Sequence, residues 1–455
     1  MRVRLLVLLF AVIFSASLLG SEKQPARRPN SAPLLYTSTP RYEPLAWMEG
    51  ADRFPHGATV FMKSNGPARP MVPGFFATAD ADVSFDAKSV LFSGKKQSAD
   101  HWQVWEVAML TGIPRQVTQC DDDCIRPLHV PGERFVYAHR SSGHFVIQIA
   151  SLKDETAPLQ LTHAPGDSIP NDVLRDGRIL FASDFPLDEG TTAELYTVYT
   201  DGSGIEAYRC DHGHSRQSSK QIPSGDVVFT RDGKLFRFTS ALAHEVPVRA
   251  PAGTYAGDVA ETPNGEWIVS AHTSSGTHFK LRTWKPGTAT SFSLVRDSKA
   301  NLLQPALLAE RPIPNRHPSA LHEWNYANAL CLNAYTSRDH IAEGAIASVR
   351  LYTRDAQGGT QVQGTAQVEK DGSFYLRVPG DVPLRIELLN AAGKTVKSEA
   401  GWFWLRKGEQ RICVGCHAGP ERAADNSVPM VLQRSTVAAD LTSPHKTQAH
   451  ATGGH

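Results

Sequence analysis

The chain lacks the features that mark several common classes of protein. Its 455 residues carry a formal net charge of +1, so the composition gives no sign of a nucleic-acid or polyanion partner. The strings G-x-S-x-G and H-E-x-x-H and a phosphate-binding glycine loop do not occur, which leaves the commonest hydrolase, zinc-protease and nucleotide sites without support. Beyond the N-terminal region there is no run of about 18 apolar residues that could span a bilayer.

Cysteine is scarce, with six in the chain, which excludes a disulfide-rich scaffold. Four of the six nevertheless stand in two close pairs. The six are Cys120, Cys124, Cys210, Cys331, Cys413 and Cys416. The short spacing within the two pairs therefore carries more information than the total.

The second pair continues into a histidine, so that Cys413, Cys416 and His417 form the string C-x-x-C-H. Two thiols at this spacing can form thioethers with the two vinyl groups of haem, and the histidine then binds the iron. A disulfide is one alternative. A zinc site is another, but its second ligand pair would have to come from Cys120 and Cys124, which are distant and differently spaced. We expect one covalently bound haem c.

The N-terminus supports that expectation. Arg2 and Arg4 precede an apolar run from Leu5 to about Leu19, and small residues follow, as in a secretory signal peptide; an N-terminal anchor is the alternative. We predict a signal peptide over residues 1–20 and a periplasmic or secreted protein. Haem c is attached outside the cytoplasm, so the export signal and the motif support each other.

The middle of the chain repeats. Five segments read as a polar turn followed by three or four apolar residues, and each is followed by a second short strand. Aligned on their turns, the repeats have a period of roughly 40 to 48 residues, the spacing of propeller blades. The aligned positions are Ala87, Gly132, Gly177, Gly225 and Gly265. We predict a six-bladed β-propeller over residues 50–308, its last blade completed by Ala58 to Ser64; an irregular all-β array or open sandwich is the alternative.

Residues 309–343 are proline-rich and aperiodic, and they are expected to be a linker. Alternating apolar residues then predict a small antiparallel β-sandwich with a C-terminal haem segment over residues 344–435, followed by a disordered tail over residues 436–455. In the strand before the motif, Trp402 and Trp404 share one face. That face could cover haem, or both tryptophans could fill the core.

Several segments in a fixed order carry a resemblance to a known family. They are the "TDGSG" hairpin, "CLNAY" from Cys331, "VEKDGSFYLRVPGDVPLRIELL" and "RICVGCHAGPE". Over roughly residues 60–435 the chain resembles the hydrazine synthase alpha-subunit family, and its hairpins resemble TolB-like propellers. The resemblance implies a propeller followed by a C-terminal domain with covalent haem at Cys413, Cys416 and His417. The synthase subunit carries a second C-x-x-C-H in a preceding, catalytic haem domain, and this chain has one such motif, so hydrazine synthesis is not expected.

The second axial iron ligand is open. Longer relatives in the family carry a histidine-containing insert that can supply it, whereas the corresponding loop here, Thr353 to Gly364, has no histidine. The candidates near the haem segment are His317, His322, His340 and Met430. His317 ranks first because flanking prolines would hold it rigidly, and Met430 would give a higher potential.

The remaining cysteines allow further pairings. Cys120 and Cys124 can close a small disulfide ring around Asp121 to Asp123, or these carboxylates can form a metal site. Cys210 and Cys331 are free or paired.

Together these features predict an exported monohaem c-type cytochrome that transfers electrons, with the propeller as docking surface for a redox partner protein. Two alternatives stay open: a protein-binding propeller with an accessory haem, and a haem enzyme related to the synthase subunit without hydrazine-forming activity.

Overall fold

The computed structural model describes residues 32–184, 192–209, 213–273, 276–295, 299–354, 358–399, 401–416, 423 and 426–444. The predicted signal peptide over residues 1–20 lies outside these ranges. Among the described residues no helix has the length and apolar character needed to cross a membrane.

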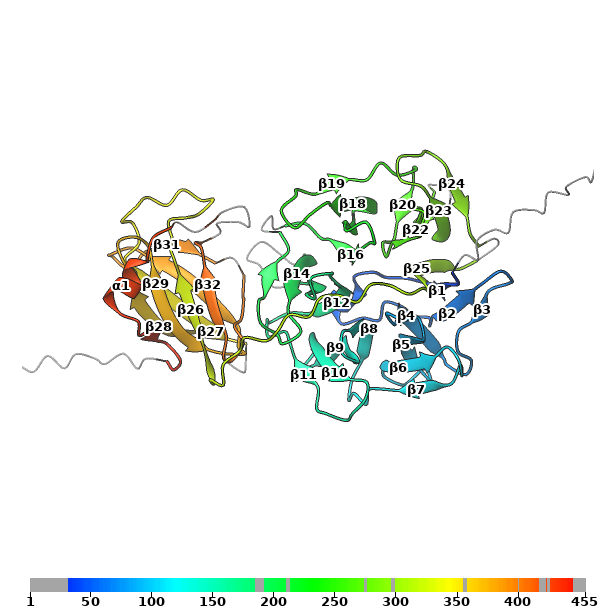
Figure 1. The fold of residues 1–455 in the computed structure, drawn as a ribbon, viewed down its shortest axis with the longest axis horizontal. Coiled ribbons are helices and arrows are strands. Elements are labelled where there is room, and N and C mark those ends of the chain that lie inside the picture. Colours follow the sequence, from blue (N-terminus) through cyan, green and yellow to red (C-terminus); the bar gives the residue numbers. More distant parts are fainter. Residues whose placement is uncertain are drawn as a thin grey trace, which may run out of the picture.

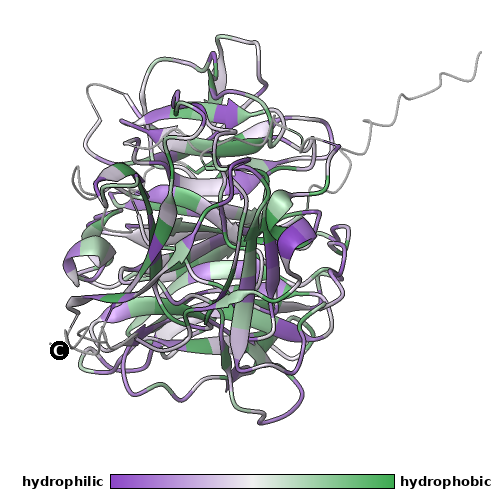
Figure 2. Cartoon of the chain, turned by 90° about the vertical axis from the view of Figure 1, so that its left-hand side faces the viewer, coloured by the Kyte–Doolittle hydropathy of each residue, from purple (hydrophilic) through white to green (hydrophobic). Residues whose placement is uncertain are grey.

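The described chain is built almost entirely of β-strands, which confirms the all-β prediction, and it forms two lobes (Figure 1). The first lobe runs from β1 to β25 and the second from β26 to β33. The described helices are short: η1 (Ala46–Glu49) in the first lobe and α1 (Met430–Arg434) in the second. Hydrophobic stretches, in green, lie along the strands and are interspersed with hydrophilic ones (Figure 2).

Within the described ranges, the strands of the first lobe form six sheets. The first sheet has the order β25 (Asn301–Leu307), β1 (Leu34–Thr39), β2 (Thr59–Lys63) and β3 (Arg69–Pro70). The second is β4 (Ala77–Val83), β5 (Ser89–Lys95), β6 (Gln103–Ala108) and β7 (Pro114–Gln116). The third is β8 (Cys124–Val130), β9 (Arg134–Ser141), β10 (His144–Ser151) and β11 (Leu159–Gln160).

The other three sheets follow in chain order. The fourth is β12 (Ser168–Val173), β13 (Ile179–Ser183), β14 (Glu194–Val198) and β15 (Glu206–Ala207). The fifth is β16 (Gln217–Gln221), β17 (Val227–Arg231), β18 (Lys234–Phe238) and β19 (Val246–Pro247). The sixth is β20 (Thr254–Tyr255), β21 (Ala260–Glu261), β22 (Trp267–His272), β23 (Lys280–Trp284) and β24 (Ser291–Ser293).

Neighbouring sheets pack face to face, and the sixth sheet contacts the first, so the order is cyclic. The packing is apolar, as between the first and second sheets, where Leu35, Val83 and Phe92 share one buried cluster. Each sheet has two faces to cover, and its two neighbours cover them, as the second and sixth sheets do for the first. The cyclic order therefore buries the apolar surface that a single repeat could not bury alone.

The repeated pairs read from the sequence are the second and third strands of each sheet from the second to the sixth. The first strands were missed, since they place polar and charged side chains at buried positions. Asp80 in β4 and Arg126 in β8 are both buried, and each has a positive φ beside a β-bulge. The two side chains lie 3.7 Å apart; Asp80 also pairs with Arg53 at 2.7 Å, and Arg126 also pairs with Asp258 at 3.5 Å.

The N-terminal segment closes the first sheet, but not in the way expected. The predicted segment, Ala58 to Ser64, contains β2, yet the strand that pairs with β25 is β1, with Leu34 opposite Leu307. The first lobe therefore starts before residue 50, because closing the sheet needs the strand that the prediction left outside.

The second lobe has two four-stranded sheets among its described residues. One has the order β32 (Gln410–Cys413), β26 (Tyr326–Cys331), β29 (Phe374–Pro379) and β33 (Ala439–Asp440). The other has the order β28 (Thr360–Gln367), β27 (Ser348–Arg354), β30 (Leu384–Leu389) and β31 (Thr395–Ser398). Their apolar residues form one cluster that includes Ala329, Leu351, Leu376 and Leu388.

This lobe differs from the predicted antiparallel domain in two ways. The pairings of β32 with β26 and of β33 with β29 are parallel, because the chain returns to the first sheet after completing the second. In addition, β26 lies inside the predicted linker over residues 309–343, and β33 lies inside the predicted tail over residues 436–455. The segment without strands between the lobes is shorter, residues 308–325.

The segment before the motif joins the two lobes. Trp404 is fully buried in a cluster of the first lobe with Phe181 and Tyr196, and its indole N–H donates to the Gly202 carbonyl oxygen at 3.4 Å. Trp402 instead packs under Arg385, whose guanidinium carbon lies 5.4 Å from the ring centroid. The two tryptophans thus do not form a shared surface, and the prediction that Trp404 covers haem is wrong because the first lobe occupies that side.

Candidate haem-attachment site

Cys413 is the last residue of β32, and strand pairing fixes its position. Cys413 lies opposite Cys331 in the parallel pair of β32 and β26, and the Leu332 amide donates to the Cys413 carbonyl oxygen at 2.9 Å. The first thiol of the motif therefore starts from a rigid strand end rather than from a free loop.

The Cys413 side chain lies in a recess at the edge of the sheet. Solvent reaches it, yet neighbouring atoms still desolvate the thiolate, and this burial is the main reason why the pKa of Cys413 is raised. The Arg411 guanidinium lowers that pKa, whereas Glu206 of the first lobe and Glu399 raise it. The recess is thus bordered by both lobes.

Cys416 turns back toward the interior. It is partly buried and packs against the core cluster of the second lobe, and its thiol is hydrogen-bonded to that of Cys331. This hydrogen bond, followed by burial, raises the pKa of Cys331 well above its usual value. The sequence offered no signal for this contact, because it depends on the register of β26 against β32.

Gly415 allows the turn between the two thiols. A Cβ added there would lie 2.0 Å from the Thr336 carbonyl oxygen and 2.7 Å from that of Asn333. Both are backbone atoms, so they cannot rotate away. The motif therefore packs tightly against the loop that follows β26.

Arg411 supplies a charged group on the same face of β32 as Cys413. Its Nη1 donates to the Ile205 carbonyl oxygen at 3.0 Å and its Nε to Glu409 Oε1 at 2.9 Å. Its Nη2 is buried and has no hydrogen-bond partner among the described residues. Two thiols that are not joined to each other, an exposed Cys413 and a guanidinium with one unpaired nitrogen among the described residues fit the attachment of an anionic haem. His417, the expected iron ligand, lies outside the described residues.

The structure separates the four candidates for the second axial ligand. His317 stacks on Tyr199 with ring centroids 3.7 Å apart, on the hairpin between β14 and β15 that also carries Glu206. His322 stacks on Trp324 and lies 3.3 Å from Gln410 Nε2, at the opposite end of β32 from Cys413. His317 thus stays the first candidate, since its hairpin borders the recess.

The other two candidates belong to the second lobe. His340 is exposed in the loop after β26. Met430 begins α1, and its amide donates to Asp371 at 2.7 Å, beside the start of β29. Both lie in segments that leave from the end of the sheet that carries Cys413.

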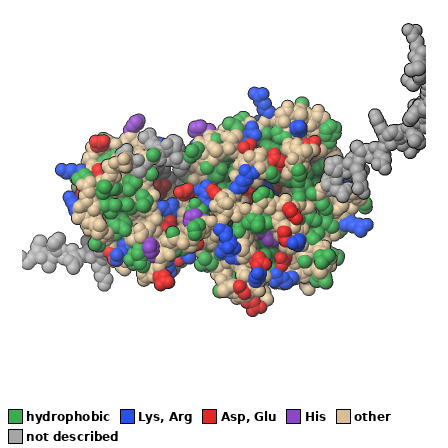
Figure 3. Space-filling view, viewed as in Figure 1, with side chains coloured by type: hydrophobic (Ala, Val, Ile, Leu, Met, Phe, Trp, Pro, Cys, Tyr) green, Lys and Arg blue, Asp and Glu red, His purple; other side chains and the backbone are tan. Residues whose placement is uncertain are grey.

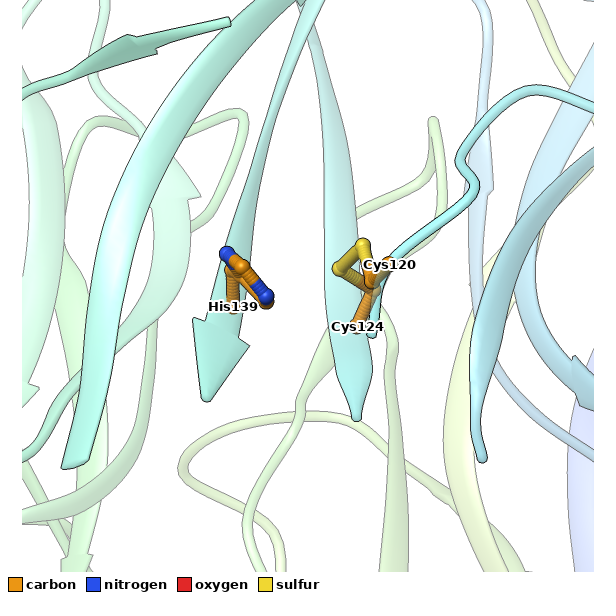
Figure 4. A group of neighbouring side chains, drawn as sticks. All are labelled: Cys120, Cys124 and His139. Carbon is orange, nitrogen blue, oxygen red and sulfur yellow. A yellow bond between two sulfur atoms is a disulfide. The ribbon is translucent and has the colours of Figure 1, made fainter. Parts of the chain in front are cut away.

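The other cysteine pair is different. Cys120 and Cys124 are joined by a disulfide with their Cα atoms 6.3 Å apart, and His139 of the neighbouring strand lies beside them (Figure 4). Asp121 accepts a hydrogen bond from His139 Nε2 at 2.9 Å, and Asp123 accepts one from the Trp102 amide at 2.8 Å. A second group of side chains is close enough to hold a metal ion: His101, Asp122 and Asp123. The His101 ring nitrogen already contacts both carboxylates.

A buried histidine of the first lobe takes part in an ion-pair network. His129 is buried in β8 and lies 2.7 Å from Asp82, which Arg311 also contacts at 3.2 Å. Burial opposes ionisation of Asp82, but Arg311 and His129 outweigh it and lower its pKa to about 2. Arg311 thereby fastens the segment between the lobes to the first lobe.

Part of the second lobe is similar to one known family. Residues 330–418 match the family described as hydrazine synthase alpha subunit middle domain. Hydrazine synthase subunit alpha of Kuenenia stuttgartiensis is 35% identical over 83 residues, which cover 18% of this chain and 10% of that protein. The matched family is described as a middle domain of the synthase subunit, and in this chain the matched residues belong to the second lobe.

The likeness in structure is wider than the likeness in sequence. The solved structure of Kuenenia stuttgartiensis hydrazine synthase has a TM-score of 0.77 with 15% identity, covering 89% of this chain and 72% of that chain. TolB from Acinetobacter baumannii has a TM-score of 0.45 with 12% identity over 61% of this chain. The first comparison shows that both lobes share their fold with the synthase structure.

Proposed function

The chain is a relative of the hydrazine synthase alpha subunit, and we propose from this premise that it is an exported protein with one covalent haem c. Cys413 and Cys416 would form the thioethers, and His417 would bind the iron. The observation that carries the proposal is the placing of two unjoined thiols at the end of β32, beside the Arg411 guanidinium, whose buried Nη2 has no hydrogen-bond partner among the described residues. When bound, a haem would supply one-electron chemistry at its iron.

The six sheets of the first lobe are then the blades of a six-bladed propeller, and the second lobe is a β-sandwich that carries the haem. The cyclic contacts and the shared apolar cluster support these assignments. The chain's own residues would hold the site: Arg411 would face an anionic group of the cofactor, and Gly415 would keep the motif against Thr336.

The primary function that we propose is electron transfer with a redox partner protein. The described part of the site contains no acid–base pair in contact with the motif thiols beyond Arg411 and the two glutamates at the edge of the recess. On the face in Figure 3, positive and negative side chains are interspersed, so docking there would depend on local charge pairs rather than on one large field. The protein would work in the periplasm or outside the cell.

Covalent attachment is tested first. Chain produced in a host with cytochrome c maturation should keep its colour in acid acetone and, after denaturation, show the mass of one added haem. Chain that loses all its haem on extraction would contradict the proposal.

A second candidate function, a haem enzyme with an open iron position, is favoured by the match to the middle domain of the synthase subunit. It is also favoured because His322 lies at the wrong end of β32 and His317 is stacked on Tyr199. Reduced protein whose spectrum is unchanged by carbon monoxide would support the electron carrier. Rapid carbon monoxide binding, and an unchanged spin state in His317→Ala, would support the enzyme.

A further inference from the structure

Strand register brings a third cysteine to the attachment site. β26 ends at Cys331 and β32 ends at Cys413, and the two residues are partners in a parallel pair. Neighbouring strands lie about 4.8 Å apart, so the backbones of these residues are adjacent although 82 positions separate them in the chain (413 minus 331). Cys331 is only 3% exposed and belongs to the core of the second lobe.

The turn after β32 brings Cys416, rather than Cys413, against this buried thiol. Cys416 packs on the cluster that contains Cys331, and the two thiols are hydrogen-bonded to each other. Cys413 has Arg411, Glu206 and Glu399 around its thiol. Of the two motif cysteines, Cys416 is therefore the one that has a thiol partner in direct contact.

We propose that Cys331 and Cys416 form a disulfide in the haem-free protein, and that this bond decides whether Cys416 is available for thioether formation. The first half stands on the contact alone. The second half rests on the proposed haem attachment. Cys331 is then the third cysteine of the attachment site.

The chemistry is thiol–disulfide exchange. The thiols of Cys331 and Cys416 lose two protons and two electrons and form one S–S bond, while an external disulfide, such as oxidised glutathione or the disulfide of a thiol oxidase, is reduced to two thiols. A dithiol reductant reverses the step. Hydrogen-bonded thiols need only small side-chain rotations to reach an S–S bond of about 2.05 Å.

Packing favours this pairing over one between Cys413 and Cys416. Gly415 is held against the backbone of Asn333 and Thr336, which fixes the turn with Cys416 pointing into the core. Joining Cys413 to Cys416 would require Cys416 to leave the cluster. Cys120 and Cys124 are already joined in the other lobe and offer no free thiol for exchange.

The test uses the full-length chain produced without haem maturation. The protein is treated with oxidised glutathione, its free thiols are alkylated, and its peptides are mapped by mass spectrometry without reduction. We expect a cross-linked pair of peptides containing Cys331 and Cys416, with a mass lower by about 2 Da than the sum of the two thiol peptides, and an alkylated Cys413. A link between Cys413 and Cys416, or alkylation of all three, would overturn the proposal.

Matched variants separate the possibilities. Cys413→Ser should keep the cross-link and Cys331→Ser should lose it; Cys331→Val serves as a second variant if the serine disturbs folding. In a maturation host under oxidising conditions, Cys331→Val should carry more covalent haem per chain than wild type. Equal loading would overturn the gating role, whereas absence of haem from both, with the cross-link still present, would count against the proposed function and not against the disulfide.

Discussion

The two close cysteine pairs behave in opposite ways, although their spacings differ by only one residue. Cys120 and Cys124 are joined, and two of the aspartates between them, Asp121 and Asp123, accept hydrogen bonds from His139 and from the Trp102 amide. Cys413 and Cys416 are not joined to each other; one lies in an open recess and the other is bonded to a distant cysteine. The difference teaches that the surroundings of two nearby cysteines decide whether they form a structural disulfide or remain separate, reactive thiols.

The largest effect is expected when each cysteine pair is removed in turn and covalent haem is measured. The double variant Cys413→Ser, Cys416→Ser should lose all covalent haem, because a thioether needs sulfur, and Cys120→Ser, Cys124→Ser should keep it. The denatured mass of each protein reads the result. Haem retained by the first variant would break the comparison.

The second largest effect is expected from a substitution of Gly415, which should lower the stability of the chain. In Gly415→Ala the new methyl group meets the Thr336 backbone, and we expect a loss of about 3 kcal/mol of unfolding free energy, the upper end for overpacking. Urea unfolding of the haem-free chain measures it. Gly66→Ala is the control, since no atom lies within 4 Å of a Cβ added there. An equal effect of both substitutions would contradict the tight turn.

The disulfide between Cys120 and Cys124 should contribute to stability, whereas the unjoined cysteines of the second pair should not. Closing a five-residue ring lowers the entropy of the unfolded chain, so Cys120→Ser with Cys124→Ser should cost about 2 kcal/mol. Cys413→Ser in the haem-free chain, at an exposed side chain, should leave the urea midpoint unchanged. A smaller cost for the double variant than for Cys413→Ser would remove the contrast.

The smallest effect depends on pH. The hydrogen bond from His139 lowers the pKa of Asp121, so the folded state holds this proton more weakly than the unfolded state. Its contribution is present at neutral pH and is lost as the pH falls through the carboxyl range. Melting temperatures of wild type and Asp121→Asn should therefore converge in acid; curves that stay parallel would exclude the contribution.

Sequence patterns predicted the parts of the molecule that depend on local order. The paired strands of each repeat, such as β5 with β6, follow a visible turn and a short apolar run. The first strands of the sheets were missed because a buried Asp80 or Arg126 resembles a loop residue until its partners are known. β26 was not recognised as a strand because it follows a proline-rich segment. Its packing against other strands, rather than its local sequence, decides its structure.

The residues of the candidate site also divide into those that local sequence reveals and those that depend on the fold. Cys413 and Cys416 were found because their spacing alone carries chemical meaning. Cys331, Arg411 and the burial of Trp404 depend on register and on contact between lobes, which no spacing encodes. Whether His317 reaches the iron stays a prediction.

The pairing of β1 with β25 has a consequence for how the chain is made. Leu34 lies opposite Leu307, so the first strand cannot find its partner until nearly the whole first lobe has been synthesised. Closing so long a loop is slow relative to forming a local hairpin. A newly made chain therefore holds an unpaired edge strand, open to pairing with other chains, until β25 has been made.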